Sequence, residues 1–215
     1  MTVRREMIDV TVVAPHPDDE VFGVGGIMRR LVARGHRLCI VAVTDGELAF
    51  GEQPPGPKTQ LVARRHEERA DALDRLGIAN RVELVRLGLP DGSVADHEPT
   101  LTARLIELCG GLVFGTFRHD GHPDHEAVGR AVARAAAARR FRLVEFVVWG
   151  SITERTGIAC GRTVRRVRLD AGTHEAKRLA VQAFRSQIDP SPDGRPVVSD
   201  ELVRQASSNV ELLIS

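Results

Sequence analysis

The sequence predicts a single α/β domain, with a Rossmann-like, doubly wound and mostly parallel sheet and helices on both faces. Three observations predict this fold class. Segments rich in β-branched residues alternate with amphipathic segments of helical period, which is typical of βαβ units. The first strand-like segment is rich in β-branched residues and the second is a continuous apolar run, as in parallel strands buried on both faces. The length of 215 residues corresponds to one domain, at about 150 residues per domain.

The first half of the chain supplies three strands and three helices in alternation. They are expected, in order, at 8–14 (strand), 25–34 (helix), 38–44 (strand), 61–76 (helix), 81–87 (strand) and 99–109 (helix). Gly35 and Gly77 end the first two helices, as glycine often does. The segment 50–57 is rich in Gly and Pro and is predicted to be a loop. It follows the second strand, where it is placed to act as a lid over a site.

The second half continues the same pattern. Its elements are expected at 111–117 (strand), 125–140 (helix), 141–149 (strand), 163–169 (strand), 173–186 (helix) and 199–206 (short helix). Pro and Gly punctuate the residues that precede the last helix. We therefore expect one domain over residues 1–215, with its core over 8–187 and a short C-terminal extension over 188–215.

Composition excludes several classes of protein. Thirty Lys and Arg balance twenty-nine Asp and Glu, so no excess of positive charge indicates nucleic acid or an anionic membrane as partner. No apolar run approaches the roughly 18 residues of a membrane-spanning helix, and the first residues lack the apolar region of a secretory signal. The three cysteines lie far apart, which disfavours a disulfide framework and a cysteine zinc site. We expect a cytoplasmic protein without a transmembrane segment.

A first polar cluster, residues 15–20 (PHPDDE), follows the first strand, where doubly wound sheets bind ligands. Adjacent acids repel one another, so at this edge they require a cation or a hydrogen-bond network. His16 and Asp19 are three residues apart and can face the same way on a turn entering a helix, which suits zinc. Asp18 then faces elsewhere, close enough to act on a water at the metal. The alternative is a helix cap by Asp18 or Asp19.

A second polar cluster, residues 119–126 (HDGHPDHE), follows the fourth strand. Catalytic zinc usually takes three protein ligands and keeps one position for water, so His122 or His125 can complete the set. Asp124 is placed to accept a hydrogen bond from the other ring nitrogen of a histidine, as carboxylates beside metal sites do. The alternative is a solvated polar loop.

Both clusters resemble motifs of one family. Residues 14–20 (APHPDDE) resemble the A-H-P-D-D-E signature of the PIG-L/LmbE-type zinc-dependent de-N-acetylases, and 121–125 (GHPDH) resemble that family's H-P-D-H motif. Their order and separation of about 100 residues also fit. The resemblance covers residues 8–187. Its supporting segments are 44–47 (TDGE), Arg65 and Glu68 before 76–77 (LG), and Lys177 and Ala180 before 186–187 (SQ).

The resemblance implies an enzyme that removes acetyl from an N-acetylated amino sugar or glycoconjugate. The ligands that it implies for zinc, or another divalent transition metal, are His16, Asp19 and His125. Asp18 is the implied general base. His122 stabilises the oxyanion or protonates the leaving amine, with Asp124 orienting it. These roles agree with the chemistry of zinc, which brings the pKa of bound water toward about 7 and polarises an amide carbonyl.

The sequence also departs from the family's pattern. It has no tyrosine to assist the oxyanion, so His122, the metal or a backbone amide takes that role. Phe184 stands where the late motif often has a histidine, which changes the substrate pocket. Few residues follow Gln187, so we expect either a more open pocket or a neighbouring subunit of a homo-oligomer that completes it. The expected substrate contacts are Arg65, which otherwise pairs with Glu68, together with His119 and Phe184.

Two other functions stay open on the sequence alone. One keeps the metal but cleaves a non-sugar amide or carbamate of a biosynthetic intermediate, which Phe184 and the short tail favour. The other is a non-catalytic Rossmann-like module that binds a nucleotide or sugar. Gly23, Gly25 and Gly26 resemble a phosphate-binding turn, although they lack the full dinucleotide spacing. The crowded acids after the first strand would repel a phosphate.

Overall fold

The computed structural model describes residues 10–150, 162–191 and 194–214. Within these residues, seven strands form one sheet in the order β3-β2-β1-β4-β5-β7-β6. The strands are β1 (Val10–Ala14), β2 (Leu38–Ala42), β3 (Val82–Arg86), β4 (Leu112–Thr116), β5 (Arg142–Phe146), β6 (Val164–Arg168) and β7 (Val210–Ile214). The helices are α1 (Asp19–Ala33), α2 (Pro55–Arg75), α3 (Glu98–Leu108), α4 (Pro123–Arg139), α5 (Ala171–Val181), α6 (Arg185–Ile188) and α7 (Asp200–Ala206), with short 3-10 turns η1 (Ala79–Arg81) and η2 (Val94–His97).

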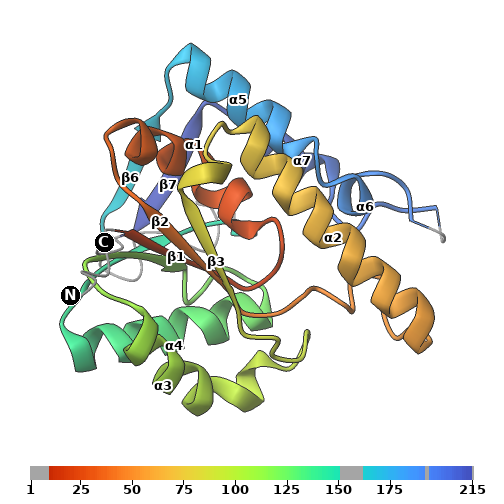
Figure 1. The fold of residues 1–215 in the computed structure, drawn as a ribbon, viewed down its shortest axis with the longest axis horizontal. Helices are drawn as coiled ribbons and strands as arrows, with labels where there is room; N and C mark the ends of the chain where they lie inside the picture. The colour runs from red at the N-terminus through yellow and green to blue at the C-terminus, as the bar shows by residue number, and fades with distance from the viewer. Residues whose placement is uncertain (1–9, 151–161, 192–193, 215) are drawn as a thin grey trace, which may run out of the picture.

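Helices cover both faces of the sheet, which confirms the predicted fold class (Figure 1). α3 and α4 lie on one face, and α1, α2, α5 and α7 lie on the other. Successive residues of β1 therefore enter different cores: Val12 belongs to one apolar cluster and Val13 to the other, both fully buried. This burial on both faces explains why β1 is composed almost entirely of apolar residues. None of the described helices is long and apolar enough to cross a membrane.

The sheet reverses its direction of growth between β1 and β4. β1 pairs in parallel with β2 on one side and with β4 on the other, and β4 pairs in parallel with β5. The carboxyl ends of β1 and β4 therefore meet at one edge, and α1 and α4 begin just beyond them. In open α/β sheets this switch point is where ligands bind. Both predicted polar clusters lie there.

Two helix starts differ clearly from the prediction, and one strand is additional. α1 begins at Asp19 rather than at residue 25, because Val24 leaves helical geometry (φ −137°, ψ 20°) and only the second part has regular periodicity. α2 begins at Pro55, inside the segment expected to be a loop, because proline suits the first position of a helix. β7 was not expected. Residues 188–215, expected as an extension, place this strand antiparallel between β5 and β6.

The glycines of α1 serve close packing. A Cβ at Gly23 would lie 2.2 Å from the ring of Phe146 on β5, and one at Gly26 would lie 2.5 Å from Leu169. Each glycine therefore lets α1 lie directly against its neighbours. This explanation removes the reason for a phosphate-binding turn, on which the ligand-binding module depended.

A buried ion pair holds the break in α1. Lys177 Nζ of α5 lies 2.7 Å from Glu211 Oε1 of β7, and both side chains are almost fully buried. The Glu211 carboxylate accepts the backbone N–H groups of Gly26 (2.7 Å) and Ile27 (2.8 Å), shortly after the break at Val24. Lys177 also donates to the carbonyl oxygen of Phe22, before the break (2.9 Å). The pair thus satisfies backbone groups that the interrupted helix leaves without partners.

Candidate metal centre

Three side chains from two helix starts converge at the switch point. His16 Nδ1 lies 3.2 Å from Asp19 Oδ2, and His125 Nε2 lies 3.1 Å from the same oxygen. The two ring nitrogens are 3.3 Å apart. All three residues are nearly or fully buried. Zinc–ligand bonds of about 2.0–2.2 Å in a tetrahedron place neighbouring donors about 3.3–3.5 Å apart, so the set fits a zinc ion.

Close packing of α4 brings His125 to this position. A Cβ at Gly129 would lie 2.6 Å from the carbonyl oxygen of Thr116, so glycine lets the helix approach the end of β4. The Thr116 hydroxyl donates to the His125 carbonyl oxygen at 2.9 Å. Helix and strand are thus fixed to one another at the turn that carries the ligand.

Carboxylates occupy the other ring nitrogens of both histidines. His125 Nδ1 lies 2.8 Å from Asp120 Oδ2. His16 Nε2 lies 3.1 Å from Asp91 Oδ1 and 3.4 Å from Asp124 Oδ2. Histidines that bind metals normally have such a partner, which fixes the ring and raises its basicity. A second group of donors, His16, His122 and Asp124, also lies within metal-binding range. The partners of His16 and His125 favour the first group.

The clustered acids make this centre attractive to cations. Burial opposes protonation of His16, but hydrogen bonds to Asp124, Asp19 and Asp91 hold its pKa well above the ordinary value. Burial likewise lowers the pKa of His125, but Asp19 and Asp120 outweigh it and raise that pKa to about 9. A centre that draws protons onto two histidines draws a divalent cation in their place.

Asp18 lies beside the donors and pairs with Arg65. Arg65 Nη2 lies 3.1 Å from Asp18 Oδ2, and the guanidinium also donates to the carbonyl oxygens of Gly46 (2.9 Å) and Pro17 (3.3 Å). A Cβ at Gly46 would lie 2.0 Å from Arg65 Nη1, so glycine makes room for the guanidinium. Burial raises the pKa of Asp18 to about 7, against the opposing charge of Arg65.

These contacts exclude two of the alternatives for the same residues. Asp18 stands at the N-cap position of α1, but its side chain makes no capping hydrogen bond there. Arg65 does not pair with Glu68, which instead accepts hydrogen bonds from the amide and hydroxyl of Ser186 (2.7 and 2.6 Å). The charged side chain of Arg64 also reaches Glu68.

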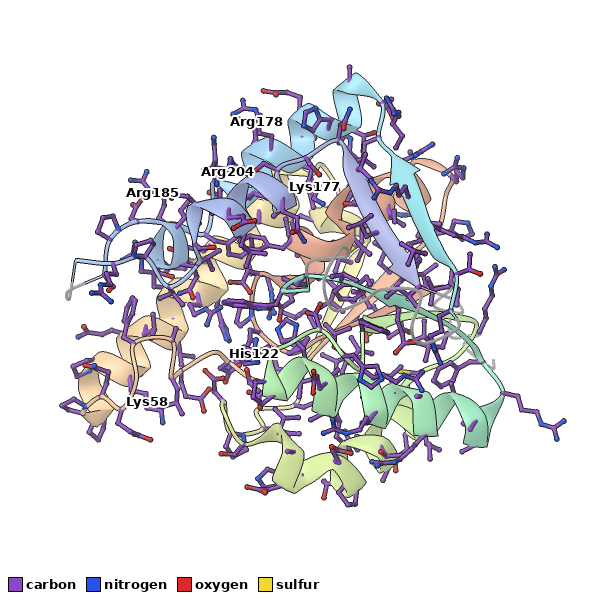
Figure 2. All side chains as sticks on the ribbon, turned by 180° about the vertical axis from the view of Figure 1, so that it is seen from behind. Lys58, His122, Lys177, Arg178, Arg185 and Arg204 are labelled. Carbon is purple, nitrogen blue, oxygen red and sulfur yellow. The ribbon has the colours of Figure 1, made fainter. Side chains whose placement is uncertain are left out.

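His122 caps α4 and faces the donor set. Its ring centroid lies 5.0 Å from that of His16 and 4.9 Å from that of His125, and Figure 2 shows it at the start of α4. Its Nδ1 accepts the backbone N–H of Asp124 at 3.3 Å, so Nε2 carries the proton of the neutral ring. Burial lowers the pKa of His122, and the nearby His125 and His16 lower it further.

The Asp124 carboxylate does not orient His122 in the way expected. Its oxygens accept the backbone N–H groups of Gly92 (2.7 Å) and Val94 (3.1 Å) and face His16. Asp124 contacts His122 through its backbone amide instead. The carboxylate therefore supports a candidate metal ligand, which was the other role expected for it.

Two predicted substrate contacts lie away from the cavity. His119 is exposed and packs edge-on against Phe117, with ring centroids 5.3 Å apart. Phe184 is fully buried and stands behind Phe22, with centroids 5.6 Å apart. Phe22, not Phe184, reaches the cavity wall. Phe184 therefore shapes the pocket only through its neighbour.

A cavity of about 260 Å³ opens over the donor set. Its polar lining residues include His16, Asp18, Asp19, Arg65, Asp91 and His122. Its apolar lining residues include Phe22, Leu48, Val148, Trp149, Val198 and Leu202. Residues from the C-terminal segment thus complete the wall within a single chain.

Sequence reasoning missed two carboxylates of the centre. Asp91 lies in the Pro-Asp-Gly turn after β3, which predicted a turn and nothing more. Asp120 lies inside the second polar cluster, five residues before His125, and the only signal for it was that spacing. Both carboxylates contact a histidine only in the folded chain, and the order of residues does not reveal these contacts.

Fold and site together define a class of protein: a Rossmann-like α/β domain with a buried His-Asp-His donor set at the switch point of its sheet. The family model PIG-L, described as GlcNAc-PI de-N-acetylase, matches residues 11–136. The chain belongs to the PIG-L family.

Similar proteins include a probable N-acetyl-alpha-D-glucosaminyl L-malate deacetylase 2 of Bacillus anthracis, 35% identical over 136 residues, which are 60% of this chain and 59% of that protein. A 1D-myo-inositol 2-acetamido-2-deoxy-alpha-D-glucopyranoside deacetylase of Mycolicibacterium vanbaalenii is 26% identical over 84% of this chain and 81% of its own. The match spans about three fifths of the length of the Bacillus anthracis protein, and the same holds for a protein of that name from Bacillus cereus.

Solved structures show the same fold. The conserved protein TT1542 from Thermus thermophilus superposes with a TM-score of 0.71 at 26% identity, over 97% of this chain and 94% of that one. The zinc-inhibited form of teicoplanin deacetylase Orf2 superposes with a TM-score of 0.67 at 18% identity, over 95% and 96% of the two chains. The similarity to teicoplanin deacetylase Orf2 shows a common fold and nothing more.

Proposed function

We propose that this chain is a zinc-dependent N-deacetylase that hydrolyses the acetamide of an N-acetylglucosaminyl conjugate to acetate and a free amine. One observation carries the proposal: the donors His16, Asp19 and His125 lie together, and two of them, His16 and Asp19, line the cavity together with Asp18. Membership of the family supports it, and so do relatives named as deacetylases of N-acetylglucosaminyl malate and of an inositol glucosaminide.

The donor chemistry suits a transition metal of zinc's type. Two neutral imidazoles and one carboxylate are a common protein set for catalytic zinc, and three ligands keep one position open. When bound, zinc supplies a Lewis acid that polarises the amide carbonyl and makes water more acidic. Every other part of the mechanism comes from the chain's own side chains.

Asp18 is the general base in this proposal. Its carboxylate accepts a proton from the attacking water, whose oxygen bonds to the carbonyl carbon. The carbon–nitrogen bond then breaks, and the same proton passes to the leaving nitrogen. Arg65 holds the carboxylate in place and favours its charged form, while burial raises the pKa of Asp18 to about 7, near the pH at which base catalysis is efficient.

His122 is the hydrogen-bond donor to the developing oxyanion. Its Nδ1 is occupied by the amide of Asp124, so the proton at Nε2 is the one available to the substrate. Because its pKa is lowered, the ring is neutral near pH 7, which favours donation to oxygen over delivery of a proton to the amine. In a chain without tyrosine, His122 takes the role that we expected it to share.

A substrate panel tests the proposed reaction. The zinc-loaded chain is expected to release acetate and primary amine in equal amounts from methyl N-acetylglucosaminide and from its malate and inositol conjugates. N-acetyl-lysine, a non-sugar acetamide, is the matched control and is expected to react far more slowly. If protein shown to contain zinc released amine from none of the glucosaminides, the proposal would be overturned. Faster release from N-acetyl-lysine would replace it with the non-sugar amidase.

A further inference from the structure

Trp149 is a large aromatic side chain left half in solvent at the cavity. It follows β5 and lines the cavity. Its exposed fraction is 42%, and among the described residues only Leu84, Trp149 and Leu179 are large hydrophobic residues with such exposure. Leu84 and Leu179 lie on β3 and α5, outside the cavity lining. The exposed indole therefore coincides with the proposed active site.

The backbone of Trp149 is tied to a candidate metal ligand. Asp120, which is fully buried, places Oδ2 2.8 Å from His125 Nδ1. The same carboxylate accepts the backbone N–H groups of Val148, Trp149 and Gly150, each at 3.1 Å. One side chain therefore fixes both the ring of His125 and the chain that carries the indole. The distance between the metal centre and the indole is set before any substrate arrives.

The indole has a polar ring and apolar side chains near it. Its ring centroid lies 5.6 Å from that of His122, at an interplanar angle of 38°. The cavity beside it continues into an apolar wall that includes Val148 and Leu202. A pyranose presents hydroxyls around its rim but carbon-bound hydrogens on its faces. A half-exposed indole in a cavity that carboxylates, histidines and an arginine also line matches that distribution.

We propose that Trp149 is the platform on which the face of the substrate's pyranose ring packs, and so selects ring glucosaminides over linear acetamides. This inference rests on the proposed function and names the residue that contacts the face of the sugar ring. The acetamide then reaches the donor set from a ring held at a fixed distance by Trp149, while the polar lining residues face the hydroxyls.

Intrinsic fluorescence tests the platform without catalysis. The chain contains one tryptophan and no tyrosine, so its tryptophan emission comes from Trp149 alone. In metal-free protein, methyl glucosaminide and methyl N-acetylglucosaminide are expected to change that emission saturably. N-acetylethanolamine, a linear acetamide, is expected to leave it unchanged. Equal responses to all three compounds, or no response to either glucosaminide up to its solubility limit, would overturn the inference.

Kinetics supply the second test, with Leu84→Ala as the matched control on an exposed apolar residue outside the cavity. Trp149→Ala is expected to raise KM for glucosaminides about tenfold, with kcat within about threefold, because a lost aromatic contact is worth on the order of a tenfold change in affinity. Trp149→Phe is expected to recover most of the loss. Unchanged KM in Trp149→Ala, with acetate still released, removes this inference and leaves the proposed function standing. If wild type hydrolyses no glucosaminide, the proposed function fails and the fluorescence titration alone decides the platform.

Discussion

Asp18→Asn is expected to lower kcat for acetate release by about 10²–10⁴-fold, the usual contribution of a general base. The side chain is nearly buried and held by Arg65, so asparagine fills the same space and keeps one oxygen for the guanidinium. It accepts no proton at neutral pH. Zinc binding should persist, because the donors are His16, Asp19 and His125. Steady-state acetate release and zinc content, measured on the same preparation, give both results.

Asp45→Asn is the matched control for that experiment. Asp45 follows the neighbouring strand β2 and contacts His66 (3.1 Å) and Arg86 (2.8 Å), but it does not line the cavity. The same change of charge is therefore expected to leave kcat within about twofold. If Asp18→Asn retained more than about a tenth of wild-type activity with zinc bound, Asp18 would not be the general base.

Lys177→Met is expected to destabilise the fold by about 3–5 kcal/mol, because it leaves the buried Glu211 carboxylate without its partner charge. Glu211 accepts hydrogen bonds from the amides of Gly26 and Ile27 in α1, and that helix begins at Asp19. Loss of the pair should therefore also weaken zinc binding. Urea unfolding followed by circular dichroism measures the first effect, and zinc titration of the folded variant measures the second.

Arg178→Ala is the control for Lys177→Met. This substitution removes the side chain of the residue that follows Lys177 in α5. The Arg178 side chain points outward and pairs with Glu175 at the surface (Figure 2). Surface ion pairs contribute little to stability, so the urea midpoint should stay at the wild-type value. A wild-type midpoint for Lys177→Met as well would show that the buried pair does not hold the helix.

The parts of the fold predicted from sequence are those whose signals are local. β1 and β2 were found because both faces are buried, which makes nearly every residue of the two strands apolar. β7 was missed because it has a charge at its second position, Glu211, in place of an uninterrupted apolar run. That charge is compatible with burial only beside Lys177, which the fold brings to it. The start of α1 was missed because Val24 interrupts its periodicity.

The site divides in the same way. The three donors and Asp18 lie in two short motifs, so the order of residues predicted their convergence once the strands were assigned. The carboxylates that support the histidines, Asp91 and Asp120, act across loops, and no spacing announces such contacts. The pairing of Arg65 was likewise a matter of direction: its helix turns the guanidinium toward Asp18 and away from Glu68.

Zinc titration of chelator-stripped protein decides whether the His16–Asp19–His125 centre drives the reaction. Acetate release from an N-acetylglucosaminide is expected to be absent from the stripped chain and to rise linearly with added zinc. The rise should end at about one ion per chain, as a single three-ligand site requires. His125→Ala should bind no zinc at these concentrations and stay inactive. Full activity in stripped protein, or in His125→Ala without bound zinc, would contradict a metal-dependent deacetylase built on this centre.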